Sequence, residues 1–512
     1  MCMKSTHKLF GLSVTIVSLL ISVCACHEKR EIGDTVIRIY ATNDIHGQVY
    51  PESNRIGVGK LMTYLKDKKD SEDNVLLLDQ GDTWQGSIYS NINYGNMITD
   101  IMNYVHYDAR TVGNHDFDWG AQYLINNTNR EFLGYKTPVL AANVYDFDFT
   151  TKRVGSIQQS QIGVTTVTYT FDEDVKVGIV GTIGDKQIAS INSFYVRELT
   201  FKNHVDVIKK EASKLREEGC QIVIACCHAD QDDLKGYGLS NYVDLVLCGH
   251  SHQNEKYIED KTLYYGQFGS NTNGLGYIEL TYHKNTNEVT TDTFKTISTS
   301  TVNSSVKTIN PTIQAIIDTY ATECEQEASQ ILATNVNGSF DATEEAPMVM
   351  CKAIYDYSKE CGYDIDFSYC NQARHYLPRG TWTYADIYEA FPFDNDIYIF
   401  EITKNEYINQ VMSDSWICKD KDTPITLSDN KTITIATIDY IAFHTNTRRY
   451  YDRLPSIDNK PIEEHIKLDK NYRTILKDWL LENQYNQGGH TLYASDFRSS
   501  NNAFNKRDVF YA

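Results

Sequence analysis

The sequence lacks several features that would place it in other protein classes. Its 12 cysteines form no CxxC pair, so neither a zinc ribbon nor a dithiol redox motif is supported. Basic residues number 48 against 68 acidic residues, and the net charge of −20 argues against binding to long nucleic acid. Beyond the N-terminus no stretch is long and apolar enough to span a membrane, and we find no internal repeat or low-complexity tract.

A small anionic substrate is compatible with this acidic balance, because bound divalent cations can reverse the local sign of a pocket. The chain has 512 residues, a length that predicts two or three domains. Apolar residues make up 41% and charged residues 23%, close to the average of soluble globular proteins. We therefore expect a folded protein with more than one domain.

The N-terminus has the composition of an export signal. Lys4 and Lys8 precede an apolar run over residues 9–23, which small residues and cysteines follow, and this order is typical of a secretory signal. Its ending, Val23-Cys24-Ala25-Cys26, resembles a bacterial lipobox, which implies that a signal peptide of residues 1–25 is removed and that Cys26 is acylated. The alternative, a buried N-terminal helix, is disfavoured by the charged residues 28–31. We expect an exported lipoprotein at the bacterial cell envelope, in the periplasm or at the cell surface.

Short β-rich runs alternate with polar turns from residue 35 to about residue 300. Valine, isoleucine and leucine dominate the runs, as expected for strands covered on both faces, and helical stretches such as 205–218 lie between some of them. The six runs are Val36–Ala41, Val75–Leu78, Ala109–Val112, Val175–Val180, Ile222–Cys226 and Val243–Leu247. This order predicts an α/β domain over residues 34–302.

The pattern changes near Asn310. Pro311 suits the first position of a helix, and Ile313, Ile316 and Tyr320 recur at helical spacing. We predict a linker helix over residues 310–332 and a second domain over residues 333–512.

Histidine, aspartate and asparagine side chains directly follow the strands of the first domain. Strands that end side by side bring such side chains together, and adjacent glycines permit tight turns near a ligand. Asp44 and His46 are two residues apart, as are His250 and His252, which puts each pair on one face of an extended segment. The candidate metal ligands are Asp44, His46, Asp82, Asn114, His228, His250 and His252.

Seven protein ligands exceed what one zinc ion accepts, but they suit two ions that share a bridging carboxylate. The mixture of nitrogen and oxygen donors favours zinc, manganese, cobalt or iron over calcium. An isolated Asp-x-His or His-x-His is more often a surface or core pair than a metal site. The seven ligands fall in five motifs, each after a predicted strand: Asp44 with His46, Asp82, Asn114, His228, and His250 with His252. All five in order therefore carry the prediction of two divalent metal ions.

With these motifs the sequence resembles the calcineurin-like metallophosphoesterases, and within them the 5′-nucleotidase family of exported two-domain bacterial enzymes. The resemblance implies a four-layer α/β/β/α fold for residues 34–302, followed by a smaller α+β substrate-binding domain. It implies that one metal is held by Asp44, His46, Asp82 and His252. It implies that the other is held by Asp82, Asn114, His228 and His250, so that Asp82 bridges the two.

The resemblance also implies that His115 is catalytic and that Asp118 is its carboxylate partner. A histidine held by a carboxylate stays oriented and easily cationic, so it can stabilise a phosphoryl oxygen or protonate a leaving alkoxide. The alternative for Asp118 is the cap of a helix that begins near Trp119. The implied reaction is attack of a metal-bridging hydroxide on phosphorus, which releases phosphate from nucleoside monophosphates or related nucleotides.

The second domain carries a partial match to the family's substrate residues. Arg374 precedes a Leu-Pro-x-Gly turn, and the resemblance implies that Phe393 stacks on a nucleobase to which Asn395 hydrogen-bonds. Tyr485 would close the other face of the base, a grip that tolerates different bases. His490 stands where the family has an acidic residue, and both glycines of the family's Asn-Gly-Gly-Ile-Arg are absent before Arg374. Phe393 and Tyr485 could instead belong to the core.

Other functions stay open at this point. A dimetal enzyme of this kind could be a 2′,3′-cyclic-nucleotide phosphodiesterase, a nucleotide-sugar hydrolase or another phosphatase. A non-enzymatic binding lipoprotein is disfavoured by the complete ligand set. We expect a small nucleotide or phosphoester as partner, no nucleic acid polymer, and membrane contact through the N-terminal lipid only; the oligomeric state is open.

Overall fold

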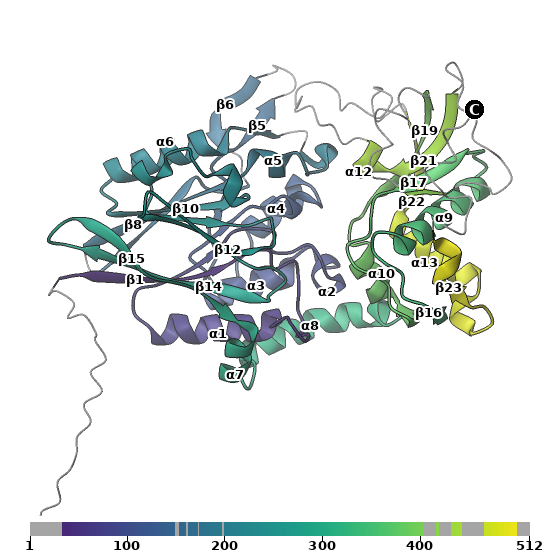
Figure 1. The fold of residues 1–512 in the computed structure, drawn as a ribbon, viewed down its shortest axis with the longest axis horizontal. Helices are drawn as coiled ribbons and strands as arrows, with labels where there is room; N and C mark the ends of the chain where they lie inside the picture. The colour runs from purple at the N-terminus through teal and green to yellow at the C-terminus, as the bar shows by residue number, and fades with distance from the viewer. Residues whose placement is uncertain are drawn as a thin grey trace, which may run out of the picture.

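The computed structural model describes residues 33–148, 153–159, 162–172, 174–196, 199–403, 416–418, 432–442 and 465–498. Figure 1 shows two domains joined by a long helix. The predicted signal peptide and the predicted lipidation site Cys26 lie outside the described residues. Within the part of the chain that is described, no helix has the length and apolar character needed to cross a membrane.

The first domain contains two six-stranded sheets, with strand orders β15-β14-β1-β2-β3-β4 and β12-β13-β11-β10-β8-β7. The first sheet is built from β1 (Thr35–Thr42), β2 (Val75–Asp79), β3 (Ala109–Thr111), β4 (Val139–Leu140), β14 (Gly274–His283) and β15 (Glu288–Ser298). The second is built from β7 (Thr166–Phe171), β8 (Val175–Ile183), β10 (Ile222–His228), β11 (Leu245–Cys248), β12 (Asn254–Glu259) and β13 (Leu263–Phe268). All six predicted runs are strands. The run expected from Val243 begins two residues later, because the Asp244 carboxylate accepts from the Val223 amide and pairs with Arg216.

The two sheets pack face to face, and helices cover their outer faces. Ile37 and Ile39 of β1 and Leu76 of β2 lie in the core between the sheets, whereas Tyr40 and Leu77 face the helices. This alternation follows from the pleat of a strand, which points successive side chains to opposite faces. Both faces are buried, which explains the continuous apolar runs. The predicted four-layer α/β/β/α fold is confirmed.

The helices of this domain differ in what they cover. α1 and α3 pack on the first sheet and α6 packs on the second. The helices are α1 (Val58–Ser71), α2 (Ile88–Asn91), α3 (Asn96–Val105), α4 (Ala121–Thr128), α5 (Asp185–Ile188), α6 (His204–Glu217) and α7 (Thr299–Ser305). A further sheet consists of β5 (Val144–Asp148), β6 (Arg153–Gln159) and β9 (Leu199–Phe201).

The linker helix is α8 (Pro311–Ala328). Pro311 stands in its first turn, where a missing amide hydrogen costs nothing. The Asn310 side chain caps the helix by accepting from the amides of Thr312 and Ile313. It ends before residue 332, because the strand of the second domain starts at Ile331. Ile313 packs into the core of the first domain and Ala328 into the core of the second, so α8 touches both.

The second domain is a mixed α and β unit with its own apolar core. Its five-stranded sheet has the order β20-β17-β21-β19-β22, and a three-stranded sheet has the order β18-β16-β23. The strands are β16 (Ile331–Asn337), β17 (Phe367–Cys370), β18 (Gly380–Thr383), β19 (Asp396–Thr403), β20 (Trp416–Cys418), β21 (Thr432–Ile438), β22 (Ile466–Asn471) and β23 (Leu492–Tyr493). The helices are α9 (Glu345–Glu360), α10 (Tyr384–Ala390), α12 (Asp439–Ala442) and α13 (Tyr472–Glu482).

Candidate dimetal active site

The predicted ligands gather at one end of the β-sandwich. Strands β1, β2 and β3 run parallel in one sheet, and β8, β10 and β11 run parallel in the other, so their carboxyl ends meet at the same edge. The loop after β1 pairs with the loop after β2, through the Asp44 amide to the Gly81 carbonyl and the His46 amide to the Asp82 carbonyl, both at 3.0 Å. Loops from both sheets therefore build one site.

The backbone at this edge is strained. A positive φ is uncommon for residues other than glycine, and it is found mainly where the surroundings enforce it, as at ligand sites. Five of the seven predicted ligands have one: Asp44 (49°), His46 (49°), Asp82 (53°), His250 (83°) and His252 (60°). The fold thus holds these side chains in orientations that an unconstrained loop would avoid.

All seven predicted ligands lie together, in two adjacent groups. The donor atoms of Asp44, His46 and His252 lie within 4.8 Å of one another, and so do those of Asp82, His228 and His250. The Asn114 Oδ1 lies 3.1 Å from the His228 Nε2 and 3.0 Å from the His250 Nδ1. The Asp82 Oδ2 lies 3.2 Å from the His228 Nε2 and 4.0 Å from the His46 Nε2, so Asp82 stands between the groups.

The donor set fits divalent metal ions. Nδ1 of His46 faces the Gln85 carbonyl at 2.9 Å, and Nδ1 of His228 faces the Gln80 carbonyl at 2.8 Å. A carbonyl accepts only, so each Nδ1 carries a proton and each Nε2 is left for a metal or for a second proton. The His228 Nε2 faces the carboxylate of Asp82 and the amide oxygen of Asn114, and the His46 Nε2 faces the His252 Nε2 at 3.0 Å. Converging donor atoms of this kind favour a positive charge among them, which a divalent metal ion supplies.

The pKa shifts of the ligand side chains also indicate a site that favours bound positive charge. Burial disfavours the anion of Asp82, yet His228 and His115 hold its pKa well below the usual range. Burial disfavours the cation of His228, yet Asp82 and Asp44 raise its pKa to about 10. Burial lowers the pKa of His46 and of His250 to about 4. His46 and His250 are therefore neutral near pH 7, the ligand state that metals need, whereas His228 in the metal-free site carries a proton that offsets the two carboxylates.

Two glycines allow the loops to meet. A Cβ at Gly113 would lie 2.2 Å from the Asp82 Oδ1, and a Cβ at Gly81 would lie 2.6 Å from the Gly113 nitrogen. Gly81 also has a φ of +92°, which a side chain would strain. The glycines adjacent to the metal-binding motifs are thus required by close backbone approach.

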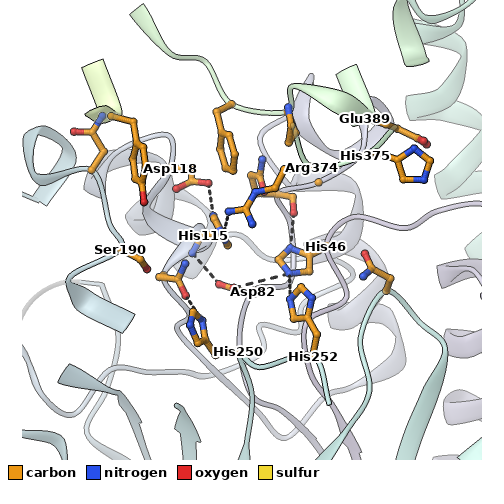
Figure 2. A pocket seen from close by; sticks show the side chains of 18 of the residues that line it. His46, Asp82, His115, Asp118, Ser190, His250, His252, Arg374, His375 and Glu389 are labelled. Carbon is orange, nitrogen blue, oxygen red and sulfur yellow. Dashed lines mark hydrogen bonds and ion pairs between the residues drawn. The ribbon is translucent and has the colours of Figure 1, made fainter. Parts of the chain in front are cut away.

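His115 and Asp118 lie beside the metal-ligand groups. Both are on or next to a short 3-10 helix, η1 (His115–Phe117), and the His115 Nδ1 lies 2.8 Å from the Asp118 Oδ2 (Figure 2). Burial disfavours its cation, but Asp118 and Asp82 raise the pKa of His115. The alternative role of Asp118 as a helix cap is wrong, because α4 begins at Ala121 with Gly120 at its cap position and no side-chain capping bond.

A cavity of about 480 Å³ opens over these groups, between the two domains. Figure 2 shows four of the ligands, His46, Asp82, His250 and His252, on one side of it. Arg374, His375 and Glu389 of the second domain lie across from them. Nη2 of Arg374 lies 3.3 Å from the Nε2 of His115. The Phe393 ring stacks on the His115 ring with centroids 5.5 Å apart, and the Arg374 guanidinium lies 5.1 Å from its centroid.

The structure does not bring all of the predicted substrate residues together. Arg374, Phe393 and Asn395 line the cavity, but Tyr485 is absent from its described lining. Tyr485 packs against Trp479 of α13, with ring centroids 5.5 Å apart, and its backbone carbonyl accepts from Thr334. His490 lies beside it and its Nδ1 faces the Asn483 carbonyl at 2.8 Å. In the described structure Tyr485 is not opposite Phe393, and it packs half-buried against the core of the second domain.

Sequence reasoning missed several residues that line the cavity. The most informative is Gln85, which is 3% exposed and whose Nε2 has no hydrogen-bond partner among the described residues. Its only sequence signal is its position three residues after Asp82 and directly before Gly86. The other missed lining residues stand on loops and helices outside the motifs that carry the metal ligands. They include Gln48, Arg55, Asn192, Tyr195, Asn371, Glu389 and Tyr440.

Comparison with known proteins agrees with this geometry. Residues 37–254 match the family model of the calcineurin-like phosphoesterases. The chain is 30% identical over 227 residues to an apyrase of Tabanus yao and 31% identical over 231 residues to a 5′-nucleotidase of Homo sapiens. These alignments cover 43% and 42% of this chain and 38% of each relative, so the matched part is about two-fifths of their length. A 5′-nucleotidase precursor from Thermus thermophilus superposes with a TM-score of 0.69 at 17% identity, over 88% of this chain and 97% of that one.

Residues 37–254 of the first domain therefore match the calcineurin-like phosphoesterases in sequence, and they carry the clustered metal-ligand candidates described above. With its linker helix and second domain, the chain shares its two-domain fold with that 5′-nucleotidase precursor.

Proposed function

We propose that this chain is a metal-dependent phosphoester hydrolase that acts on nucleotides, with nucleoside monophosphates as the leading substrates. One observation carries the proposal: both metal-ligand groups, the His115–Asp118 pair and the Arg374 guanidinium line one cavity. Two relatives bear the names apyrase and 5′-nucleotidase, which supports a nucleotide as substrate. The acidic chain needs cations at this site to attract a phosphate.

The two ligand groups would hold two divalent ions, zinc, manganese, cobalt or iron, with Asp82 shared. Such ions, when bound, polarise phosphoryl oxygens and lower the pKa of water. The ligands would be Asp44, His46, Asp82 and His252 for one ion and Asp82, Asn114, His228 and His250 for the other. Bringing seven ligands to one edge of two sheets is the contribution of the fold.

The chain's own residues orient the ester and handle the proton. Asp118 holds the proton of His115 on Nδ1, so Nε2 faces the cavity and can donate to an ester oxygen when the ring is cationic. Arg374 adds fixed positive charge 3.3 Å from that nitrogen, so the two groups could contact the same phosphoryl group. The Phe393 ring lies over His115, so it shields this side of the site from water and offers a flat face to a base.

A second candidate is a dimetal hydrolase for a phosphoester without an enclosed base. The position of Tyr485 outside the described cavity lining favours it, because the second ring predicted to enclose a base is then not opposite Phe393. Nucleotide sugars, 2′,3′-cyclic nucleotides and simple phosphate monoesters belong to this candidate.

A substrate panel separates the two candidates. We would measure phosphate release by the full chain with manganese or zinc from AMP, UMP, a 2′,3′-cyclic nucleotide, UDP-glucose with added phosphatase, and an aryl phosphate. A kcat/KM for AMP or UMP at least tenfold above that for the aryl phosphate is the expected result. Equal values would favour the second candidate, and no metal-dependent release from any ester would contradict both.

We further propose that the protein is exported and acylated at Cys26, at the periplasmic side or the surface of the envelope. The positive, apolar and small-residue order of residues 4–26 supports this location. Labelling with a fatty-acid analogue in cells should mark the unaltered chain and leave Cys26→Ser unmarked. Equal labelling of both would refute the anchor.

A further inference from the structure

Helix α2 belongs to the first domain in sequence, but its side chains reach into the second domain. It follows the loop that carries Asp82, and three of its four residues contact the other half of the molecule. Ile88 is 1% exposed and lies in the apolar core of the second domain. The Tyr89 hydroxyl donates to the Glu325 carboxylate on α8 at 3.1 Å. The short helix is therefore a docking element between the domains (Figure 1).

Asn91, the last residue of α2, connects the two sides of the cavity through one carboxamide. Its Oδ1 accepts from the Gly86 amide at 2.9 Å, and its Nδ2 donates to the Pro392 carbonyl at 3.0 Å. The residue is 2% exposed, and its bond to Pro392 is buried whereas its bond to Gly86 is part-buried. Each end uses the group that suits it, an acceptor for an N–H and a donor for a carbonyl.

The two bonded backbone groups each stand next to a functional residue. Gly86 follows Gln85, whose carbonyl accepts from the His46 Nδ1 and so fixes the tautomer of a metal-ligand histidine. Pro392 precedes Phe393, whose ring stacks on His115. The chain His46, Gln85–Gly86, Asn91, Pro392–Phe393 thus runs from a metal ligand to the proposed base-stacking ring by backbone continuity and three hydrogen bonds.

We propose that Asn91 is a positioning residue that sets the substrate-binding loop of the second domain at its working distance from the metal-binding loop. The inference rests on the proposed function, and it names the residue that aligns the metal-binding loop with the substrate-binding loop. Asn91 touches neither the ester nor the metals, and it acts through Gly86 and Pro392. The adjacent apolar contact of Ile88 holds the two domains together but is not directional. The Asn91 hydrogen bonds are directional, so they fix the position of one loop relative to the other.

The variant Asn91→Asp separates the two bonds. A carboxylate still accepts from the Gly86 amide, but it cannot donate to Pro392, and its second oxygen faces the Pro392 carbonyl. We expect the KM for AMP to rise about tenfold with kcat within about threefold, since the buried Pro392 carbonyl loses its donor and the substrate-binding loop loses its fixed position. If AMP is not a substrate, the KM is read on the best ester of the panel. A merely destabilised fold would lower the active fraction and kcat, not raise KM.

Small-angle X-ray scattering of the substrate-free protein gives a second readout that needs no turnover. We expect the interatomic distance distribution of Asn91→Asp to differ from that of the unaltered chain, and that of Asn126→Asp to match it. Asn126 is the matched control, an exposed asparagine on α4 bonded only to Gln122 in the described structure. If Asn91→Asp does not fold, Asn91→Ala takes its place, since it removes both bonds without adding charge.

The outcomes are distinct. An unchanged KM or an unchanged scattering profile would overturn the role of Asn91. Absence of nucleotide turnover in the unaltered chain would count against the proposed function alone, because the scattering comparison and the KM on another ester still test the connection between the loops.

Discussion

At the scale of single residues, the site depends on how each polar side chain is held by one neighbour. His46 and His228 are oriented by backbone carbonyls, and His115 is oriented by Asp118. The ring nitrogen that remains in each case faces the shared cavity or the ligand cluster. A residue's chemistry here follows from which of its two nitrogens is already bonded.

The His115→Asn variant tests the proton-handling role. An amide cannot become cationic or donate a proton to an ester oxygen, so kcat should fall by at least about 100-fold, the usual scale of acid–base groups. Bound metal, measured by atomic emission, should stay unchanged because His115 is not a ligand. His106→Asn is the control, since this exposed residue has a φ of 67°, which asparagine tolerates. A loss confined to metal content would contradict the assignment.

Asp439 makes the stability of the second domain depend on pH. Burial and then the charge of Asp396 raise its pKa to about 7, while Lys467 acts in the opposite direction and Tyr195 faces it from the first domain. The folded state therefore holds a proton that the unfolded chain has lost, and stability falls as pH rises from about 4 to about 7.

The Asp439→Asn variant should remove this dependence. It keeps an acceptor for the Tyr440 amide without the charge, so at pH 8 we expect it to be more stable by roughly 2 kcal/mol, with no gain at pH 4.5. Thermal unfolding at the two pH values measures the difference. The same change of melting temperature with pH in both proteins would show that Asp439 is not its source.

At the scale of elements, hydrogen bonds and an ion pair of Asp116 hold the loops after β2 and β3 together. The Asp116 carboxylate accepts from the amides of Asp82, Thr83 and Gly113, and it pairs with the buried Arg110 of β3 at 2.6 Å. The Arg110 guanidinium lies 3.7 Å from the centroid of the Trp84 ring. This network fixes the backbone of the loops that present Asp82 and Asn114.

Arg110→Met should therefore weaken both folding and metal binding. It leaves the Asp116 charge buried without its partner, which costs about 3–5 kcal/mol, and groups that support metal ligands change affinity by about 10–100-fold. Denaturant unfolding and a manganese titration measure the two effects. Arg38→Met is the control, because its contacts to Asp73 and Glu279 are at the surface and should be worth under about 1 kcal/mol. Equal effects of the two variants would refute the network.

The first domain was predictable because its signals are local. Each ligand follows an apolar run, so a strand, a turn and a functional side chain stand within a few residues, as with Asp44 and His228. The Arg110–Asp116 pair was not predictable, because a charged residue inside a strand gives no sign of its partner. Tyr485 shows the converse limit: an aromatic residue before glycines is equally compatible with stacking on a ligand and with packing on Trp479.

At the scale of the whole molecule, function requires two domains that fold around separate cores and share one cavity. The first supplies the metal ligands and the second supplies Arg374 and Phe393. Their relative position is maintained by α8, which packs in both cores, and by α2 with its Asn91 carboxamide. A change at this interface should therefore alter substrate affinity without altering metal content.

The most direct test of the account is a titration of the metal-free full chain with manganese, with bound metal and AMP hydrolysis followed together and Asp82→Asn run in parallel. The account predicts two ions per chain, hydrolysis that rises with occupancy of the second, and a loss of at least one ion with most of the activity in Asp82→Asn. Full hydrolysis without metal, or with a single ion in the unaltered chain, would contradict it.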